Sequence, residues 1–190
     1  MVGYAAEHGE ADGLILAMAG GDEAAFAELW VRYAGAVRGL GHKFLGSRSD
    51  GEDVAQEAFH KAWRMAARFD PDRGSGRVWL FAIARNVALD RLRRQRIRWL
   101  AGLDELTVEP EEPGPSAERA TEARAKLREV HAALLDLPDA QRMALLLSAV
   151  AELETPEIAM VLGRSRGAVE QLVVRARRTL RERMEETGHA

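Results

Sequence analysis

The C-terminal part of the sequence carries side chains that can recognise DNA bases. Residues 163–178 read GRSRGAVEQLVVRARR. An arginine can donate two hydrogen bonds to a guanine edge, a glutamine can pair with adenine, and a glutamate can accept from cytosine. The residues that we predict to face a DNA major groove are Ser165, Arg166, Gly167, Glu170, Gln171 and Val174. Among them, Ser165 can cap a helix, and Gly167 lets the backbone approach the bases closely.

The later arginines of the same segment are better placed to bind phosphate. We predict phosphate contacts for Arg175, Arg177, Arg178 and Arg181. Phosphate contacts add affinity and fix the register but carry no sequence information. A run of arginines near the C-terminal end of a helix is also favoured by the helix dipole, and then needs no ligand. The arginines alone therefore leave both interpretations open.

A helix-turn-helix is predicted to position these side chains. In TPEIAMVLG, we expect Thr155 to cap a helix with Pro156 at its first position, and Gly163 to end it in the left-handed conformation. Small Ala159, turning Gly163 and apolar Val169 have the spacing that two steeply crossing helices need. The second helix is predicted to turn its apolar residues inward; these are Val169, Val173, Ala176 and Leu180.

The whole chain is predicted to be all-helical, because apolar residues recur every three or four positions outside one segment. That segment, GLDELTVEPEEPGPSAE at 102–118, is acidic and too proline-rich to be helical. We therefore expect two small helical domains joined by a flexible acidic linker. The predicted limits are an N-terminal tail at 1–12, a first domain at 13–99, the linker at 100–122, and a second domain with the helix-turn-helix at 123–187.

The first domain is predicted to carry an acidic helix and a basic helix. In SDGEDVAQEAFHKAWRMAARF, Ser49 and Glu52 form a capping-box pair. The face opposite its apolar residues shows Asp53, Gln56, Glu57 and His60. After the turn DPDRGSG comes RVWLFAIARNVALDRLRRQR, whose polar side carries Asn86, Asp90, Arg93 and Arg94. The net charge of −3 at pH 7 hides this segregation of charge along the chain.

Composition excludes several classes of protein. With 190 residues and no cysteine, the chain has no disulfide, thiolate metal ligand or cysteine nucleophile. The N-terminal residues MVGYAAEHGEADG carry acids and lack the basic, apolar and small-residue succession of a signal peptide, so we expect none there, and no apolar run is long enough to cross a membrane. We expect a soluble cytoplasmic protein without membrane insertion.

Four motifs in one order point to a family. They are DVAQEAFHKAWR at 53–64, VWLFAIARNVALDRLRR at 78–94, LDLPDAQRMALLL at 135–147 and ETPEIAMVLGRSRGAVEQLVVRARRTL at 154–180. Over nearly the whole chain, the sequence resembles the extracytoplasmic-function (ECF) sigma factors, the two-domain class of bacterial transcription initiation subunits. The resemblance implies sigma region 2 in the first domain and sigma region 4 in the second. It also implies a function, which is to bind core RNA polymerase and direct transcription from promoters.

The resemblance assigns the acidic helix to the polymerase. Residues matching Asp53, Gln56 and Glu57 dock on the basic clamp coiled coil of the largest subunit, and the flap of the polymerase is implied as a further contact. Carboxylates in the first turn of a helix also complement its dipole, and that interpretation stays open for Asp53.

The resemblance assigns two DNA contacts. The turn at 69–76 matches the loop that receives a base extruded from the −10 element, and the helix after it holds the opened strand. The implied −10 residues are Asp70, Arg73, Arg77, Asn86, Asp90, Arg93 and Arg94. The helix-turn-helix is implied to read the −35 element. Here the sequence departs from the family at Leu172 and Glu170, where basic residues are frequent, so the −35 sequence that it reads is open.

Partners and alternatives follow from the same residues. The resemblance implies an anti-sigma factor that clasps both domains, a stress or envelope-response regulon, no cofactor and no small-molecule substrate. A helix-turn-helix regulator acting as a dimer without polymerase leaves the motifs at 53–64 and 78–94 unexplained. The other alternative is an enzyme with a metal bound at Asp70 and Asp72. The sequence after these residues lacks the closing glutamate of a calcium-binding loop, and the histidines do not show the paired spacing of a zinc site. We therefore expect no catalytic residue and no metal site.

Overall fold

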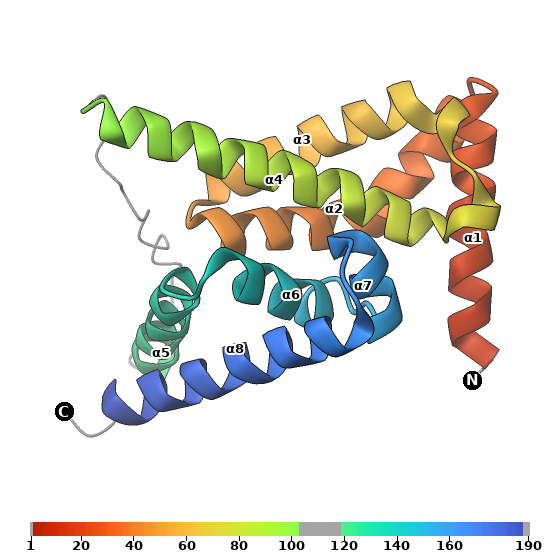
Figure 1. Cartoon of the computed structure of the whole chain (residues 1–190). Coiled ribbons are helices and arrows are strands. Elements are labelled where there is room, and N and C mark those ends of the chain that lie inside the picture. The colour runs from red at the N-terminus through yellow and green to blue at the C-terminus, as the bar shows by residue number, and fades with distance from the viewer. Residues whose placement is uncertain (1, 103–118, 188–190) are drawn as a thin grey trace.

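The computed structural model describes residues 2–102 and 119–187, with the side chains of 2–8, 119–125 and 187 left out. Within these residues the fold is all-helical, as predicted, with eight α-helices and two short 3-10 helices (Figure 1). They are α1 (Val2–Ala19), α2 (Glu23–Leu45), α3 (Arg48–Met65), η1 (Ala66–Arg68), η2 (Pro71–Arg73), α4 (Gly76–Leu100), α5 (Arg119–Leu135), α6 (Asp139–Ala149), α7 (Thr155–Leu162) and α8 (Arg166–Thr187).

Helices α2, α3 and α4 build the first domain around an aromatic core. Phe44, Phe59 and Phe81, one from each helix, are fully buried. The α2 and α3 backbones come close together where Gly51 faces α2, because a Cβ at that position would lie 2.7 Å from the Arg38 carbonyl oxygen. This close packing sets the position of the polar face of α3.

Helix α1 occupies the region where we predicted an N-terminal tail. The tail was expected to span 1–12, whereas the helix begins at Val2. Its Ala11 and Ile15 are buried, and the Asp12 carboxylate accepts a hydrogen bond from the Gly76 backbone at the start of α4. The apolar run LILAM at 14–18 has no helical period, so contacts with α2 and α4 rather than local pattern define this element.

Two helix starts differ from the prediction by one or two residues. Helix α3 is capped by Ser47 instead of Ser49, because the Ser47 hydroxyl accepts from the Asp50 backbone at 3.0 Å. Helix α7 has Glu154 as its cap, which places Thr155 inside the helix. There the Glu157 carboxylate accepts from the Glu154 backbone at 2.8 Å. Several polar side chains near each start compete for the cap, and local sequence does not decide between them.

The second domain contains the predicted helix-turn-helix. Gly163 ends α7 with a φ of 62°, in the left-handed region, and its N–H donates to the carbonyls of Ala159 and Met160. In α8, Val169 and Ala176 are fully buried, while Val173 and Leu180 are half-buried. The inward face of α8 is therefore the one that the apolar spacing predicted.

The two domains pack against each other (Figure 1). Helix α7 lies on α4, while α5 and α6 lie against α2. One continuous cluster of buried side chains joins them, with Phe44 and Phe81 on one side and Leu147 and Ile158 on the other. The predicted linker lies largely outside the described residues, which resume at 119.

Candidate nucleic-acid and polymerase interface

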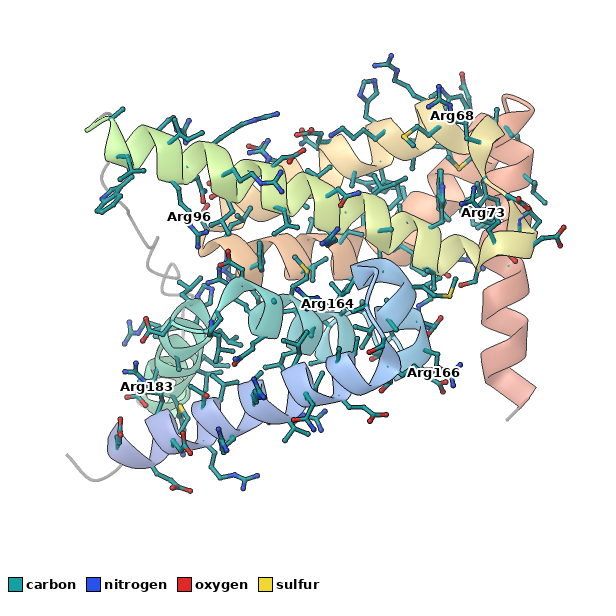
Figure 2. All side chains as sticks on the ribbon, in the orientation of Figure 1. Arg68, Arg73, Arg96, Arg164, Arg166 and Arg183 are labelled. Carbon is teal, nitrogen blue, oxygen red and sulfur yellow. The ribbon has the colours of Figure 1, made fainter. Side chains whose placement is uncertain are left out.

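The start of α8 presents the predicted −35 residues on one exposed face. All are exposed to solvent: Ser165, Arg166, Gly167, Glu170, Gln171, Val174, Arg175 and Arg178. Figure 2 shows Arg166 at the beginning of α8, on the side away from the first domain. The apolar Val174 is 60% exposed on this face. An apolar side chain among polar groups at the start of such a helix suits contact with a thymine methyl group.

Local hydrogen bonds and charges shape this face. The Ser165 hydroxyl accepts from the Ala168 backbone at 3.3 Å, as its predicted capping role requires. Arg178 lies 3.7 Å from Glu182 one turn later. Both side chains are well exposed, so this pair is weak and leaves the guanidinium available to a stronger anion.

The loop between α3 and α4 borders an open-sided cavity of about 300 Å³ that α4 and Met160 of α7 also line. Phe69 and Trp79 form part of its wall, with ring centroids 5.6 Å apart. Asp70 shapes the loop, because its carboxylate accepts from the Asp72 backbone at 3.1 Å and caps η2. The predicted −10 residue Arg73 lines the same cavity, and so does Arg68, which sequence analysis missed; both belong to the connection between α3 and α4 (Figure 2). An aromatic wall beside cations suits an unstacked nucleobase with its phosphates.

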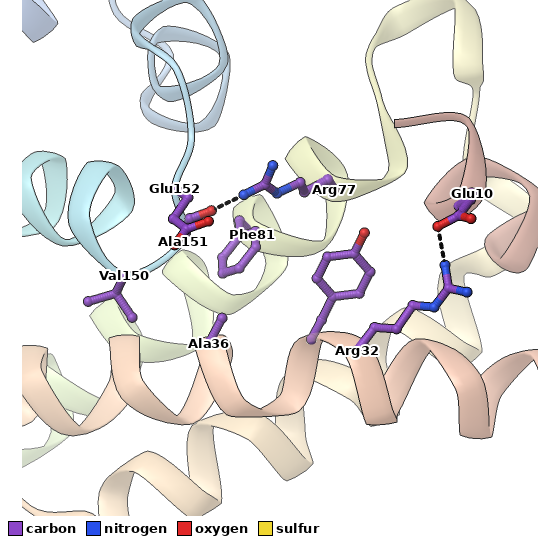
Figure 3. A pocket seen from close by; sticks show the side chains of 9 residues that line it. Glu10, Arg32, Ala36, Arg77, Phe81, Val150, Ala151 and Glu152 are labelled. Carbon is purple, nitrogen blue, oxygen red and sulfur yellow. Dashed lines mark hydrogen bonds and ion pairs between the residues drawn. The ribbon is translucent and has the colours of Figure 1, made fainter. Parts of the chain in front are cut away.

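The other predicted −10 residues lie along α4, and one of them differs from the rest. Asn86, Arg93 and Arg94 are exposed, and Arg93 donates to the Asp90 carboxylate at 2.6 Å. Arg77, in contrast, is only 9% exposed. Its guanidinium donates to the backbone carbonyl of Ala151 in the second domain (Figure 3). The structure thus brings together the loop and the outer side of α4 but places Arg77 at the domain interface.

The predicted polymerase-binding residues lie on the outer side of α3. Asp53 and Gln56 are exposed, and Glu57 is partly exposed. A hydrogen bond from Lys61, at 2.8 Å, lowers the pKa of Glu57 below its ordinary value of 4.5 against the opposing effect of burial. The nearby charges of Arg91 and Arg94 lower this pKa further. Glu57 is therefore held firmly in its charged form.

Sequence analysis missed two neighbours of these acids. Arg91 of α4 lies 2.9 Å from the Asp53 carboxylate and 3.8 Å from that of Glu57. No local signal joins them, since Arg91 and Asp53 are 38 positions apart. The second neighbour is an apolar groove of about 560 Å³, lined by Phe26, Trp30, Phe59 and Trp63 together with Gln56. Phe59 is fully buried, whereas Trp63 is only half-buried.

The described residues contain neither a metal site nor a membrane span. Among them, no group of three His, Asp or Glu side chains could hold a metal ion. The Asp70 carboxylate, which we considered as a metal ligand, serves as the cap of η2. Within the same residues, no helix is long and apolar enough to cross a membrane.

Comparisons with known proteins agree with this architecture. Residues 29–98 match the family model of sigma-70 region 2, and residues 127–180 match that of sigma-70 region 4. The chain is 36% identical to the RNA polymerase sigma factor CnrH of Cupriavidus metallidurans, over 90% of this chain and 93% of CnrH. It is 32% identical to the ECF RNA polymerase sigma factor RpoE of Cereibacter sphaeroides, over 86% of this chain and 88% of that protein.

Solved structures show the same fold. The structure of CnrH in complex with the cytosolic domain of CnrY superposes with a TM-score of 0.71 at 28% identity, covering 93% of this chain and 98% of that one. The RpoE of Bartonella quintana, crystallised with the anti-sigma factor NepR, gives a TM-score of 0.68 at 22% identity, covering 84% and 96% of the two chains. The chain therefore belongs to the ECF class of RNA polymerase sigma factors.

Proposed function

We propose that this protein binds core RNA polymerase, recognises the −35 and −10 elements of a promoter, and melts the −10 region to start transcription. The observation that carries this proposal is the cavity beside Phe69 and Trp79. A regulator that binds only duplex DNA has no use for an aromatic cavity next to a basic helix. A protein that captures unstacked bases needs both.

Melting requires binding energy and no covalent chemistry. Extruding a base costs a few kcal/mol, and stacking on an aromatic side chain returns about 1–3 kcal/mol per base. The half-buried Trp79, whose ring centroid lies 5.6 Å from that of the buried Phe69, supplies the stacking surface, while Arg93 and Arg94 of α4 lie where they can hold the strand's phosphates. The protein therefore acts as a non-enzymatic subunit, and catalysis belongs to the polymerase.

The −35 element is the proposed partner of α8. Arg166, Glu170 and Gln171 are exposed near the start of this helix, where side chains of a helix-turn-helix reach base edges. Arg175 and Arg178 lie farther along and contact phosphates. Because Glu170 favours cytosine, the base read at its position is expected to differ from that of relatives with a lysine there.

Core polymerase is the proposed partner of α3. Asp53 and Gln56 are exposed and Glu57 is charged, which suits a basic protein surface. The apolar groove bordered by Trp30 and Trp63 adds a surface that an apolar side chain of the partner can fill. Because its partners are polymerase and chromosomal DNA, we place the protein's action in the cytoplasm.

An anti-sigma factor is the proposed regulator. CnrH was solved in complex with the cytosolic domain of CnrY, and the present chain superposes on that structure over most of its length. A partner of this kind would cover the polymerase-binding face and hold the protein inactive until a stress or envelope signal releases it.

A run-off transcription assay with core enzyme tests the proposed function. We expect promoter-specific transcripts from genomic templates only when both core enzyme and this protein are present. Specific DNA binding without core enzyme, with no transcript, would instead identify a helix-turn-helix regulator. Absence of both core binding and transcripts would reject the proposal.

A further inference from the structure

A second cavity lies next to the one that Phe69 and Trp79 line, which we call the aromatic cavity. The second cavity has a volume of about 280 Å³ and is formed by the end of α3 and by η1. We call it the α3 cavity, and its lining residues are Lys61, Arg64, Met65 and Arg68. The proposed promoter contacts leave this cavity unassigned. Two arginines and a lysine around one hollow favour a ligand with negative charge.

The two cavities are neighbours, because Arg68 lines both of them. Arg68 is the last residue of η1, which follows α3 directly. Figure 2 shows Arg68 and Arg73, which lines the aromatic cavity, at the same end of the first domain. With about 300 Å³ in the aromatic cavity, the two hollows are similar in size. A strand with an unstacked base in the aromatic cavity therefore finds a second site of similar size beyond Arg68.

The arginines of the α3 cavity are available to an anion. Arg64 and Arg68 are both exposed, and neither guanidinium forms an ion pair with another residue in the part of the chain that the structure describes. Lys61 differs, because its ammonium group lies 2.8 Å from the Glu57 carboxylate. The two arginines therefore supply the available positive charge of this cavity, and Lys61 marks its border with the acidic residues of α3.

Charge is divided along α3 in a way that suits two different partners. The earlier turns carry Asp53 and Glu57, which we propose to face the polymerase, whereas the last turn and η1 carry Arg64 and Arg68. Basic side chains at the end of a helix complement its dipole, which accounts for their sign. The dipole does not account for the cavity that they line or for its continuity with the aromatic cavity. A DNA strand is repelled by the earlier turns and attracted by the last one.

Met65 gives the α3 cavity an apolar wall. Its side chain is half-buried at the end of α3. The thioether of a methionine makes favourable contacts with aromatic rings, and the flexible side chain adapts to rings of different shape. Arginine and lysine add the methylene groups of their stems to such a wall, while their charged heads stay in water. The cavity therefore combines a surface for a nucleobase with cations for the phosphates beside it.

The strand is expected to reach the two cavities from the side of α4. Arg93, a proposed phosphate contact, lies roughly 21 Å along α4 from Trp79, at about 1.5 Å per residue. This length corresponds to about six base-pair steps at about 3.4 Å each, so it suits the duplex upstream of the captured base. The α3 cavity meets the aromatic cavity at Arg68, on an edge that α4 does not form. It is short and suits a single strand that leaves downstream.

We propose that the α3 cavity binds the nucleotide immediately downstream of the captured −10 base, with Arg64 and Arg68 on its phosphates and Met65 against its base. The proposal rests on the proposed promoter function, since it requires a base in the aromatic cavity. Two consecutive unstacked nucleotides are then held on the first domain. Binding of the second offsets part of the cost of unstacking, so the α3 cavity helps to keep the −10 element open.

A series of shortened strands tests this proposal. The ligand is opened −10 DNA, which is a promoter found by run-off transcription and opened at its −10 element. Its non-template strand is shortened from the downstream end by one nucleotide at a time. Binding in the presence of core enzyme is measured at each length for the unaltered protein, for Trp79→Ala and for Arg64→Ala.

The two substitutions should take effect at different strand lengths. The loss caused by Trp79→Ala should appear at the length that first includes the captured base. The loss caused by Arg64→Ala should appear one or two nucleotides later and amount to about twofold to fivefold, as for exposed ion pairs. Arg64→Ala should also reduce the slope of log affinity against log salt by about 0.7, the effect of one phosphate contact on a single strand.

Two further variants serve as controls. Arg64→Lys keeps the positive charge and should keep the salt dependence of the unaltered protein. Arg48→Ala removes the same charge from an exposed position at the other end of α3. Any effect of Arg48→Ala should be equal at all strand lengths, because this residue is remote from the α3 cavity.

The outcomes separate this proposal from the proposed function. If Arg64→Ala weakens binding equally at all lengths or at none, Arg64 does not contact the downstream nucleotide and the inference is wrong. A loss that appears at shorter strands than the loss caused by Trp79→Ala would place the contact upstream and equally reject it. An abasic downstream nucleotide should weaken binding of the unaltered protein, and unchanged binding would contradict the role of Met65. If the unaltered protein with core enzyme binds no strand and yields no transcript, the proposed function itself is wrong.

Discussion

Arg91 of α4 donates a 2.9 Å hydrogen bond to the Asp53 carboxylate of α3, so a cation lies within the face proposed to meet the polymerase. The same guanidinium lies 3.6 Å from Asp50 and 3.8 Å from Glu57. These pairs are partly exposed and each contributes little to stability. Their larger effect is electrostatic, because Arg91 offsets part of the negative charge that a basic partner would meet.

Replacing Arg91 should therefore strengthen core binding. We expect Arg91→Ala to bind core enzyme about twofold to fivefold more tightly, in line with the small energies of exposed ion pairs, whereas Asp53→Ala should bind more weakly. The measurement is a fluorescence titration with core enzyme at two salt concentrations. Arg177→Ala, which removes the same charge from the exposed side of α8, should leave core affinity unchanged. Weaker binding by Arg91→Ala would contradict this role.

Glu57 should make stability depend on pH. Its pKa is lowered in the folded protein, chiefly by the hydrogen bond from Lys61. A carboxylate of this kind stabilises the fold above its unfolded pKa, near 4.5, and loses that effect as pH falls through its lower folded pKa. Urea unfolding of Glu57→Gln and the unaltered protein should differ at pH 7 and converge below pH 4 or so. A difference that stays constant from pH 7 to pH 3 would rule out this linkage.

Replacing Gly163 and Gly167 by alanine should change stability in opposite directions. Gly163 has a φ of 62° and open space around it, so Gly163→Ala should lower the free energy of unfolding by about 1–2 kcal/mol through backbone strain alone. Gly167 lies inside α8, also with open space, so Gly167→Ala should raise stability by about 0.5–1 kcal/mol. Thermal unfolding measures both changes.

Gly167→Ala should nevertheless weaken binding to −35 duplex, because an added methyl group would stand between the backbone and the bases. Unchanged −35 affinity in this variant would mean that the start of α8 does not approach the DNA closely.

Trp79 should contribute to binding of opened −10 DNA and not to binding of −35 duplex. Loss of one stacking surface costs about 1–3 kcal/mol per base, so Trp79→Ala should weaken binding to opened −10 DNA by roughly fivefold to more than a hundredfold. Binding to −35 duplex serves as the internal control and should stay the same. Equal loss at both DNA sites would indicate that the substitution disturbs the fold, and no loss at −10 would remove Trp79 from the cavity's function.

Local sequence was enough to predict the helix-turn-helix. Gly163 ends α7 in the predicted left-handed conformation, and Val169 and Ala176 are buried as their spacing requires. These features depend on neighbours three or four positions away, which a sequence displays directly. Helix α1 and the cap at Ser47 escaped prediction, because packing against α2 and α4 decides the first and competition between hydroxyls decides the second.

The sequence by itself determined the helical elements other than α1, the residue types at each proposed DNA-facing position and the family to which the chain belongs. Only the tertiary structure decided which distant residues meet: Arg91 with Asp53, Met160 with Gly74, and Arg77 with the Ala151 carbonyl. Periodicity records which face of a helix is buried but not which partner buries it, since any apolar surface of matching shape satisfies the same pattern. The packing of the two domains therefore had to be seen in three dimensions.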